Sequence, residues 1–177
     1  MEEIYDLAIL GAGPAGICAA IYATRGKLNT LWLEKKFVQG GQIVDTYEVD
    51  NYPGLPGITG LDLGETMVKH AEKLGIKPKR EPVLSIEDEG EVKVIRTKKN
   101  QYRARAVILA CGAAHRQLGI PGEEELSGMG VSYCATCDGA FFPGWNGCSR
   151  RRRKCRCRRC NPSFQNMQEG LSCAQKR

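Results

Sequence analysis

A short apolar segment that runs directly into a glycine-rich turn constrains the fold of this chain more than any other feature. Residues 4–10 are predicted to form a buried strand, Gly11-Ala12-Gly13-Pro14-Ala15-Gly16 follows, and residues 17–25 form a helix of small residues. In Gly-x-Gly-x-x-Gly the first glycine allows a tight turn, the second lets the backbone approach a diphosphate, and the third packs the helix on the strand. The helix N-terminus attracts phosphate charge, and Pro14 suits its first turn. This order predicts an α/β domain that binds a dinucleotide.

The next segment strengthens the prediction. Gly26 ends the helix, and residues 28–33 form a second predicted strand that leads to Glu34. An acid about 20 residues beyond the glycines can bind ribose hydroxyls. Strand, glycines, helix, strand and acid together are much more specific than the glycine motif alone.

The following segments add a long loop, a helix and three strands. Loop 35–60 contains Gly40-Gly41-Gln42 and Asn51, and a loop of this length is either functional or a plain connector. Residues 61–74 have helical spacing of core residues that includes Leu63 and Leu74, with His70 on the surface. Segments 83–86, 91–96 and 102–110 are predicted to form a small antiparallel layer. Cys18 and Cys111 are interpreted as small core residues.

A Cys-x-x-Cys pair, Cys134 and Cys137, lies near the end of this regular pattern and is followed directly by Asp138. Two thiols at this spacing can close into a disulfide that exchanges electrons readily. The same spacing also occurs in half of a zinc site. The motif alone leaves both interpretations open.

Charge and cysteine content change abruptly near residue 143. Residues 144–177 carry ten Lys or Arg against one acid, and five of the nine cysteines, whereas residues 1–143 carry sixteen basic and nineteen acidic groups. We therefore place a boundary here. The first residues form no basic leader and the apolar runs are short, so we expect neither signal peptide nor membrane span, and a cytoplasmic protein. In that compartment a disulfide is expected to be catalytic.

Residues 1–143 resemble the N-terminal portion of a bacterial-type, low-molecular-weight thioredoxin reductase. The motifs that carry the resemblance are GAGPAG at 11–16, GGQI at 40–43, NYPG at 51–54, IPGEEE at 120–125 and CATCDGAFF at 134–142. The resemblance implies an FAD-binding, Rossmann-like three-layer domain, with a parallel sheet and a small antiparallel layer, into which an NADPH domain is inserted. We expect the N-terminal part of the FAD domain at 1–113, and a connector with the start of the NADPH and disulfide domain at 114–143.

The resemblance also implies the residues that bind the cofactor and react. The ADP half of FAD is expected at Gly11, Gly13, Pro14, Ala15, Gly16 and Glu34, and the remaining FAD contacts at Gly40, Gly41, Gln42, Asn51, Val83 and Gly112. Electrons pass in this family from NADPH through FAD to the Cys134–Cys137 disulfide and on to thioredoxin, within a homodimer. Cys134 is the expected interchange thiol, Cys137 the flavin-side thiol, and Asp138 the acid or base that manages the thiolate proton.

The resemblance stops after Phe142, where a second glycine fingerprint for NADPH is expected but residues 150–160 are dominated by arginine and cysteine. We favour an out-of-frame tail: with synonymous codons chosen freely, a one-base shift from Gly147 onward reads as strand, glycine turn, helix and strand. Two alternatives are a thiolate metal site that includes Cys155, Cys157 and Cys160, and an arginine-rich segment that binds nucleic acid. We do not expect nucleic acid as a partner, because the segment lacks interleaved aromatic residues. We expect residues 144–177 to be unstructured.

These observations separate ancestry from activity. Without an NADPH site we expect no NADPH-driven turnover by this chain, which makes a non-catalytic flavin-binding fragment the main alternative. A related flavoprotein that reduces a peroxidase shares the glycine and cysteine motifs, but it would need a further N-terminal module.

Overall fold

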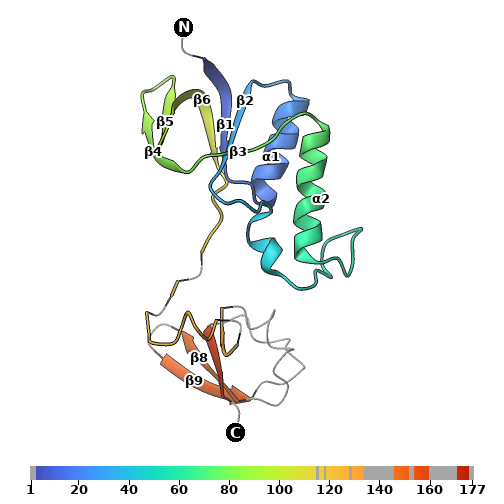
Figure 1. Cartoon of the computed structure of the whole chain (residues 1–177), viewed down its shortest axis with the longest axis vertical. Coiled ribbons are helices and arrows are strands. Elements are labelled where there is room, and N and C mark those ends of the chain that lie inside the picture. The colour runs from blue at the N-terminus through green and yellow to red at the C-terminus, as the bar shows by residue number, and fades with distance from the viewer. Residues whose placement is uncertain are drawn as a thin grey trace. The chain divides into compact units, whose positions relative to one another are not determined.

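Figure 1 shows the computed structural model of the chain, which describes residues 3–114, 116–117, 119–127, 129–133, 146–151, 154–159 and 171–175. For the last three ranges it describes the backbone alone. The chain divides into two compact units, Met1–Ala113 and Ala114–Arg177.

The first unit is a six-stranded mixed sheet with helices against one of its faces. Its strands have the order β3-β2-β1-β6-β5-β4 in the sheet. They are β1 (Ile4–Leu10), β2 (Thr30–Glu34), β3 (Lys79–Arg80), β4 (Val83–Asp88), β5 (Lys93–Thr97) and β6 (Gln101–Leu109). The helices are α1 (Pro14–Arg25), the 3-10 turn η1 (Gly41–Asp45) and α2 (Gly60–Lys73).

The predicted strand, glycine turn and helix at the N-terminus are confirmed. Helix α1 begins at Pro14 rather than at residue 17, because proline has the φ of a helical residue and the first turn needs no N–H at that position. Helix α2 is capped by Thr59, whose Oγ1 accepts a hydrogen bond from the Asp62 backbone N–H at 3.1 Å. The short turn η1 lies within the predicted loop 35–60, and the sequence pattern did not indicate it.

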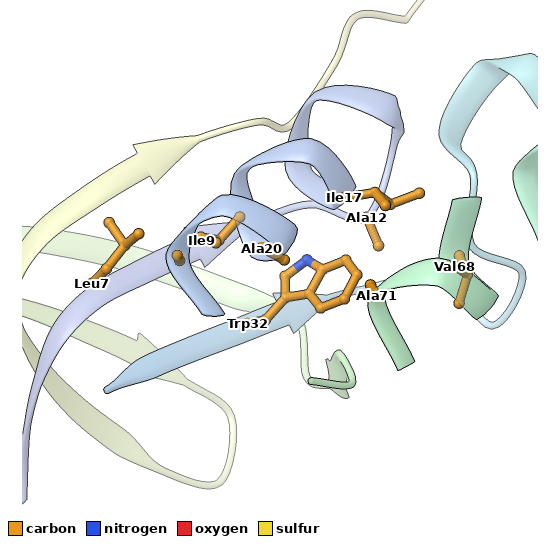
Figure 2. Packing of buried hydrophobic residues seen from close by; sticks show 9 residues of the cluster. Leu7, Ile9, Ala12, Ile17, Ala20, Trp32, Val68 and Ala71 are labelled. Carbon is orange, nitrogen blue, oxygen red and sulfur yellow. The ribbon is translucent and has the colours of Figure 1, made fainter. Parts of the chain in front are cut away.

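The core has two parts because side chains alternate across the strands. Leu7, Ile9 and Trp32 point to one face of the sheet, where they pack against residues of α1 and α2 such as Ile17 and Val68 (Figure 2). The opposite face has its own cluster, with members from four strands: Ala8, Leu10, Leu31, Leu33, Ile95 and Ala104. Ile95 of β5 thus lies over the parallel strands, and the three-layer prediction is confirmed.

The predicted antiparallel layer is joined to the parallel sheet rather than separate from it. Strand β6 pairs in antiparallel register with β5 through residues 101–104, and in parallel register with β1 through residues 103–109. One long strand therefore belongs to both layers (Figure 1). The sequence pattern indicated the strand but not this double pairing, because register depends on partners far away in the chain.

Three of the residues predicted to lie in the core are exposed. Cys18 lies beside the buried stripe of α1 instead of on it, and Cys111 follows the end of β6. Leu74 is 37% exposed, because α2 ends at Lys73 and the chain turns away there. The prediction that His70 lies on the surface is confirmed.

The second unit contains β7 (Val131–Ser132), β8 (Asn146–Arg151), β9 (Lys154–Arg159) and β10 (Leu171–Gln175), in the sheet order β7-β10-β8-β9. A strand ladder pairs backbone groups and needs no apolar period in its side chains. The prediction that residues 144–177 form an out-of-frame, unstructured tail stays untested.

The reactive residues predicted in this unit, Cys134, Cys137 and Asp138, lie outside the described residues, and so does Cys160 of the alternative metal site. Among the described residues no group of three or more His, Cys, Asp or Glu side chains is placed to hold a metal ion. Within the same residues, every helix is too short or too polar to cross a bilayer.

Candidate dinucleotide-binding site

The glycine turn lies where the parallel strands end. It follows the carboxyl end of β1, between the carboxyl ends of β2 and β6, which flank β1 on either side. In open α/β sheets, ligands bind at this edge of the strands. The fold therefore places the predicted binding motif at the edge of the sheet where a ligand is expected.

Two residues of β2 hold Gly11 in place. The Gly11 N–H donates to the Leu33 carbonyl at 2.8 Å, and the Trp32 indole Nε1 donates to the Gly11 carbonyl at 3.0 Å. Trp32 is 1% exposed, and this hydrogen bond is partly buried. The glycine motif thus depends on a tryptophan that sequence reasoning missed. The alternation of strand 28–33 could have suggested that Trp32 faces the helices, but not that it reaches the turn.

Ala12 is fixed in the same way from both sides. Its N–H donates to Glu34 Oε2 at 2.5 Å, and its carbonyl accepts from the Gly40 N–H at 2.7 Å. Glu34 Oε1 also accepts the N–H groups of Lys35 and Lys36, at 2.7 and 2.8 Å. Three backbone donors therefore orient the Glu34 carboxylate, and because each carboxylate oxygen can accept twice, Oε2 keeps capacity for one more donor. Its role toward a ribose stays a prediction.

The three motif glycines are needed for different reasons. A Cβ on Gly11, which has φ +111°, would lie 2.2 Å from the Ala110 carbonyl oxygen, and a Cβ on Gly16 would lie 1.9 Å from the Gly11 carbonyl oxygen. The fold itself excludes side chains at both positions. Gly13 has φ −80° and ψ 179°, which any residue adopts, and its Cβ would meet only Gly41 Cα, at an ordinary 3.6 Å. The protein leaves space at Gly13, as the close approach of a diphosphate requires.

The start of α1 supplies donors for such a group. The first N–H groups of a helix have no partner within the helix, and here those of Ala15 and Gly16 lie directly after Gly13 and Pro14. The first turn carries no acidic side chain that would compete with an anion, and no side chain caps it. With the helix dipole, these features fit the diphosphate of a dinucleotide.

The Gly40-Gly41-Gln42 segment lies against the motif. A Cβ on Gly41, at φ +68°, would approach Gly13 Cα to 2.9 Å, so the two glycines meet backbone to backbone. The Gln42 side-chain amide donates to the carbonyl of Ala113, which joins this segment to Gly112, at φ +66°, beyond the end of β6. The structure thus brings Gly40, Gly41, Gln42 and the segment around Gly112 to the same edge of the sheet as the glycine turn.

Two predicted residues have no described contact with this cluster. Asn51 is exposed in the loop between η1 and α2. Val83 begins β4 at the far edge of the sheet, where it packs on the cluster of Leu31 and Ile95. A pair that the sequence did not indicate lies just beyond β2, where the Arg80 guanidinium is 5.2 Å from the centre of the exposed Phe37 ring.

Comparison with known proteins agrees with this geometry. Residues 5–145 match the family model described as pyridine nucleotide-disulphide oxidoreductase. Thioredoxin reductase from Bacillus subtilis is 48% identical over 143 residues, which are 81% of this chain and 45% of that protein. The enzyme of the same name from Listeria monocytogenes is 51% identical over 141 residues, 80% of this chain and 44% of its own length.

Solved structures give the same result. Thioredoxin reductase from Lactococcus lactis has a TM-score of 0.66 and 47% identity, over 80% of this chain and 46% of that chain. The one from Streptococcus pyogenes has a TM-score of 0.70 and 42% identity, over 82% of this chain and 47% of that one. The chain thus spans just under half the length of the relatives it matches. Because the family model covers well over half of this sequence, the chain belongs to the pyridine nucleotide-disulphide oxidoreductase family.

Proposed function

We propose that this chain is the FAD-binding and disulfide-bearing portion of an NADPH-dependent thioredoxin-disulfide reductase. The observation that carries the proposal is the open backbone surface at Gly13, beside the start of α1, where no side chain caps the helix and the first N–H groups have no partner within it. The names of the relatives support the choice of thioredoxin as the protein substrate. The homodimer and the cytoplasmic location expected from the resemblance belong to the same proposal.

The residues at the glycine turn bind and orient the cofactor. The N–H groups of Ala15 and Gly16 would donate to the diphosphate, and the Glu34 carboxylate, already oriented by Ala12, would accept from a ribose hydroxyl. Gly40, Gly41, Gln42 and Gly112, which lie at the same edge of the sheet, would contact the remaining parts of the cofactor. The resemblance alone supports Asn51 and Val83 as further contacts. When bound, FAD supplies two-electron redox chemistry between a nicotinamide donor and the disulfide.

The Cys134–Cys137 pair passes the electrons on. In the reduced pair, the Cys134 thiolate attacks the thioredoxin disulfide and forms a mixed disulfide, while one thioredoxin sulfur leaves as a thiolate. Cys137 then attacks the Cys134 sulfur, which releases dithiol thioredoxin and re-forms the Cys134–Cys137 disulfide. Asp138 accepts the proton of the attacking thiol, so that the sulfur reacts as a thiolate, and then returns the proton to the thioredoxin sulfur that is released.

The proposal is tested on the purified full chain with FAD, NADPH and thioredoxin. We expect FAD to bind with a saturable change in its absorbance spectrum, and the chemically reduced chain to reduce about one equivalent of thioredoxin disulfide. A chain in which Cys134 and Cys137 are both serine is the control and should transfer nothing. Failure to bind FAD, or equal transfer by the control, would refute the proposal.

A second candidate is a flavin-binding chain without NADPH-driven turnover. It is favoured by the sequence, in which Gly-x-Gly-x-x-Gly occurs once within 177 residues. We expect NADPH to leave the bound flavin oxidised. Prompt bleaching of the flavin absorbance by NADPH would exclude this candidate and support the complete reaction.

A further inference from the structure

A buried carboxylate lies in the connector that precedes the cysteine pair. Glu123 is only 5% exposed, although it stands in the acidic run Glu123-Glu124-Glu125, whose other two members are exposed. Its Oε2 accepts the backbone N–H of Gly119 at 2.7 Å and that of Ile120 at 3.4 Å. Its Oε1 accepts the Tyr133 hydroxyl at 2.7 Å. One carboxylate therefore joins the beginning of this segment to its end.

The segment between these ends is folded back on itself. The Val131 N–H donates to the Leu126 carbonyl at 2.8 Å, and the Leu126 N–H donates to the Gly122 carbonyl at 3.0 Å. Val131 and Ser132 are 5% and 8% exposed. The hydrogen bond to Glu123 raises the pKa of Tyr133, with burial and the charge of Glu123 acting in the same direction. Tyr133 therefore stays a neutral donor across the physiological range.

Tyr133 directly precedes Cys134 in the chain. We propose that Glu123 and Tyr133 are a positioning pair that fixes the N-terminal end of the Cys134–Cys137 segment and thereby stabilises its disulfide form. The inference rests on the proposed redox role of this pair. Its physical basis is that a disulfide forms more favourably when the chain that carries the thiols has less freedom to lose.

The equilibrium that measures this effect is exchange with glutathione. The Cys134 thiolate attacks glutathione disulfide and releases one glutathione thiolate, and Cys137 then attacks Cys134 and releases the second. The chain loses two electrons and two protons in all, and one glutathione disulfide becomes two glutathione molecules. The equilibrium constant of this exchange reports how well the segment is arranged for closure.

The test determines this constant for the full chain and for Tyr133→Phe, by alkylation in glutathione buffers and mass spectrometry of the peptide with both cysteines. We expect Tyr133→Phe to lower the constant about 3- to 10-fold, the factor that one hydrogen bond is worth. Glu123→Gln places an amide NH₂ donor against the donors that Glu123 now accepts from. This substitution should lower the equilibrium constant at least as much. Tyr22→Phe, at a tyrosine that is 75% exposed, and Glu124→Gln are matched controls and should leave it unchanged.

A merely structural role would lower the free energy of unfolding and leave this constant unchanged. An unchanged constant in Tyr133→Phe would therefore overturn the inference alone, while the proposed redox function would stand. If the unmodified chain forms no Cys134–Cys137 disulfide in any glutathione buffer, the proposed function fails, and the inference fails with it.

Discussion

Alanine at Gly13 should weaken FAD binding and leave the stability of the fold unchanged, whereas alanine at Gly16 should destabilise the fold. Both glycines belong to the same motif, and a reading of the motif alone treats them alike. A Cβ at Gly16 would lie 1.9 Å from the carbonyl oxygen of Gly11, whereas a Cβ at Gly13 would lie 3.6 Å from its nearest neighbour, Gly41 Cα. Gly16→Ala therefore forces the backbone around Gly11 to shift. Gly13→Ala leaves the backbone in place and fills only the space in which the cofactor would lie.

The expected size of each effect follows from these distances. Alanine at position 16 of α1 gains about 1 kcal/mol of helix propensity over glycine, but overlap with the backbone costs about 1–3 kcal/mol or more. The Gly11 carbonyl cannot move aside cheaply, because the Trp32 indole holds it at 3.0 Å. We therefore expect a net loss of about 2 kcal/mol in Gly16→Ala. In Gly13→Ala the smaller entropy of the unfolded chain offsets the poorer N-cap, so stability changes by less than about 0.5 kcal/mol.

The assay combines urea unfolding, followed by circular dichroism, with FAD titration of the folded protein. Gly13→Ala should unfold at the urea concentration of the unmodified chain and bind FAD at least about tenfold more weakly, which is about 1.4 kcal/mol. Gly16→Ala should unfold at a lower urea concentration. The reasoning is refuted if Gly13→Ala binds FAD as well as the unmodified chain, or if Gly16→Ala is equally stable.

Two further predictions concern residues that stabilise the first unit. Trp32→Phe should lower the free energy of unfolding by about 1–3 kcal/mol in urea titrations, because it leaves the partly buried Gly11 carbonyl without its donor; unchanged stability would contradict this. Burial raises the pKa of Glu81, but hydrogen bonds from Thr97, Tyr102 and Asn100 together hold it below its ordinary value. The carboxylate therefore stabilises the fold above the unfolded pKa of about 4.3, and the stability difference between the unmodified chain and Glu81→Gln should shrink as the pH falls below 4. A difference that stays constant from pH 7 to pH 3 would contradict this.

Local patterns were sufficient to predict the elements that build the site. The apolar run 4–10 and the glycines after it specify β1 and the turn to α1. The burial of the strand and the start of the helix both depend on residues that are adjacent in the sequence. Glu34 could be placed at the end of β2 by its distance along the chain. These predictions depend on short-range chemistry, which a single sequence contains.

Tertiary contacts could not be predicted in this way. The hydrogen bond from Trp32 to Gly11 spans 21 residues, and the one from Gln42 to Ala113 spans 71. The burial of Glu123 was also missed, because the acidic run in which it stands is typical of a solvated surface. In each case the tertiary fold determines which group lies close enough to bond. The local sequence pattern would be the same if that contact were absent.

The central claim is that the glycine turn of this chain binds FAD, and Trp32 provides the most direct measurement of it. The chain has two tryptophans, so in Trp145→Phe the fluorescence comes from Trp32 alone, whose indole contacts Gly11. We predict a saturable quenching of this fluorescence by FAD at one equivalent, which ADP reverses and a further Gly13→Ala substitution weakens at least tenfold. A folded chain whose Trp32 fluorescence shows no saturable response to FAD would contradict the claim.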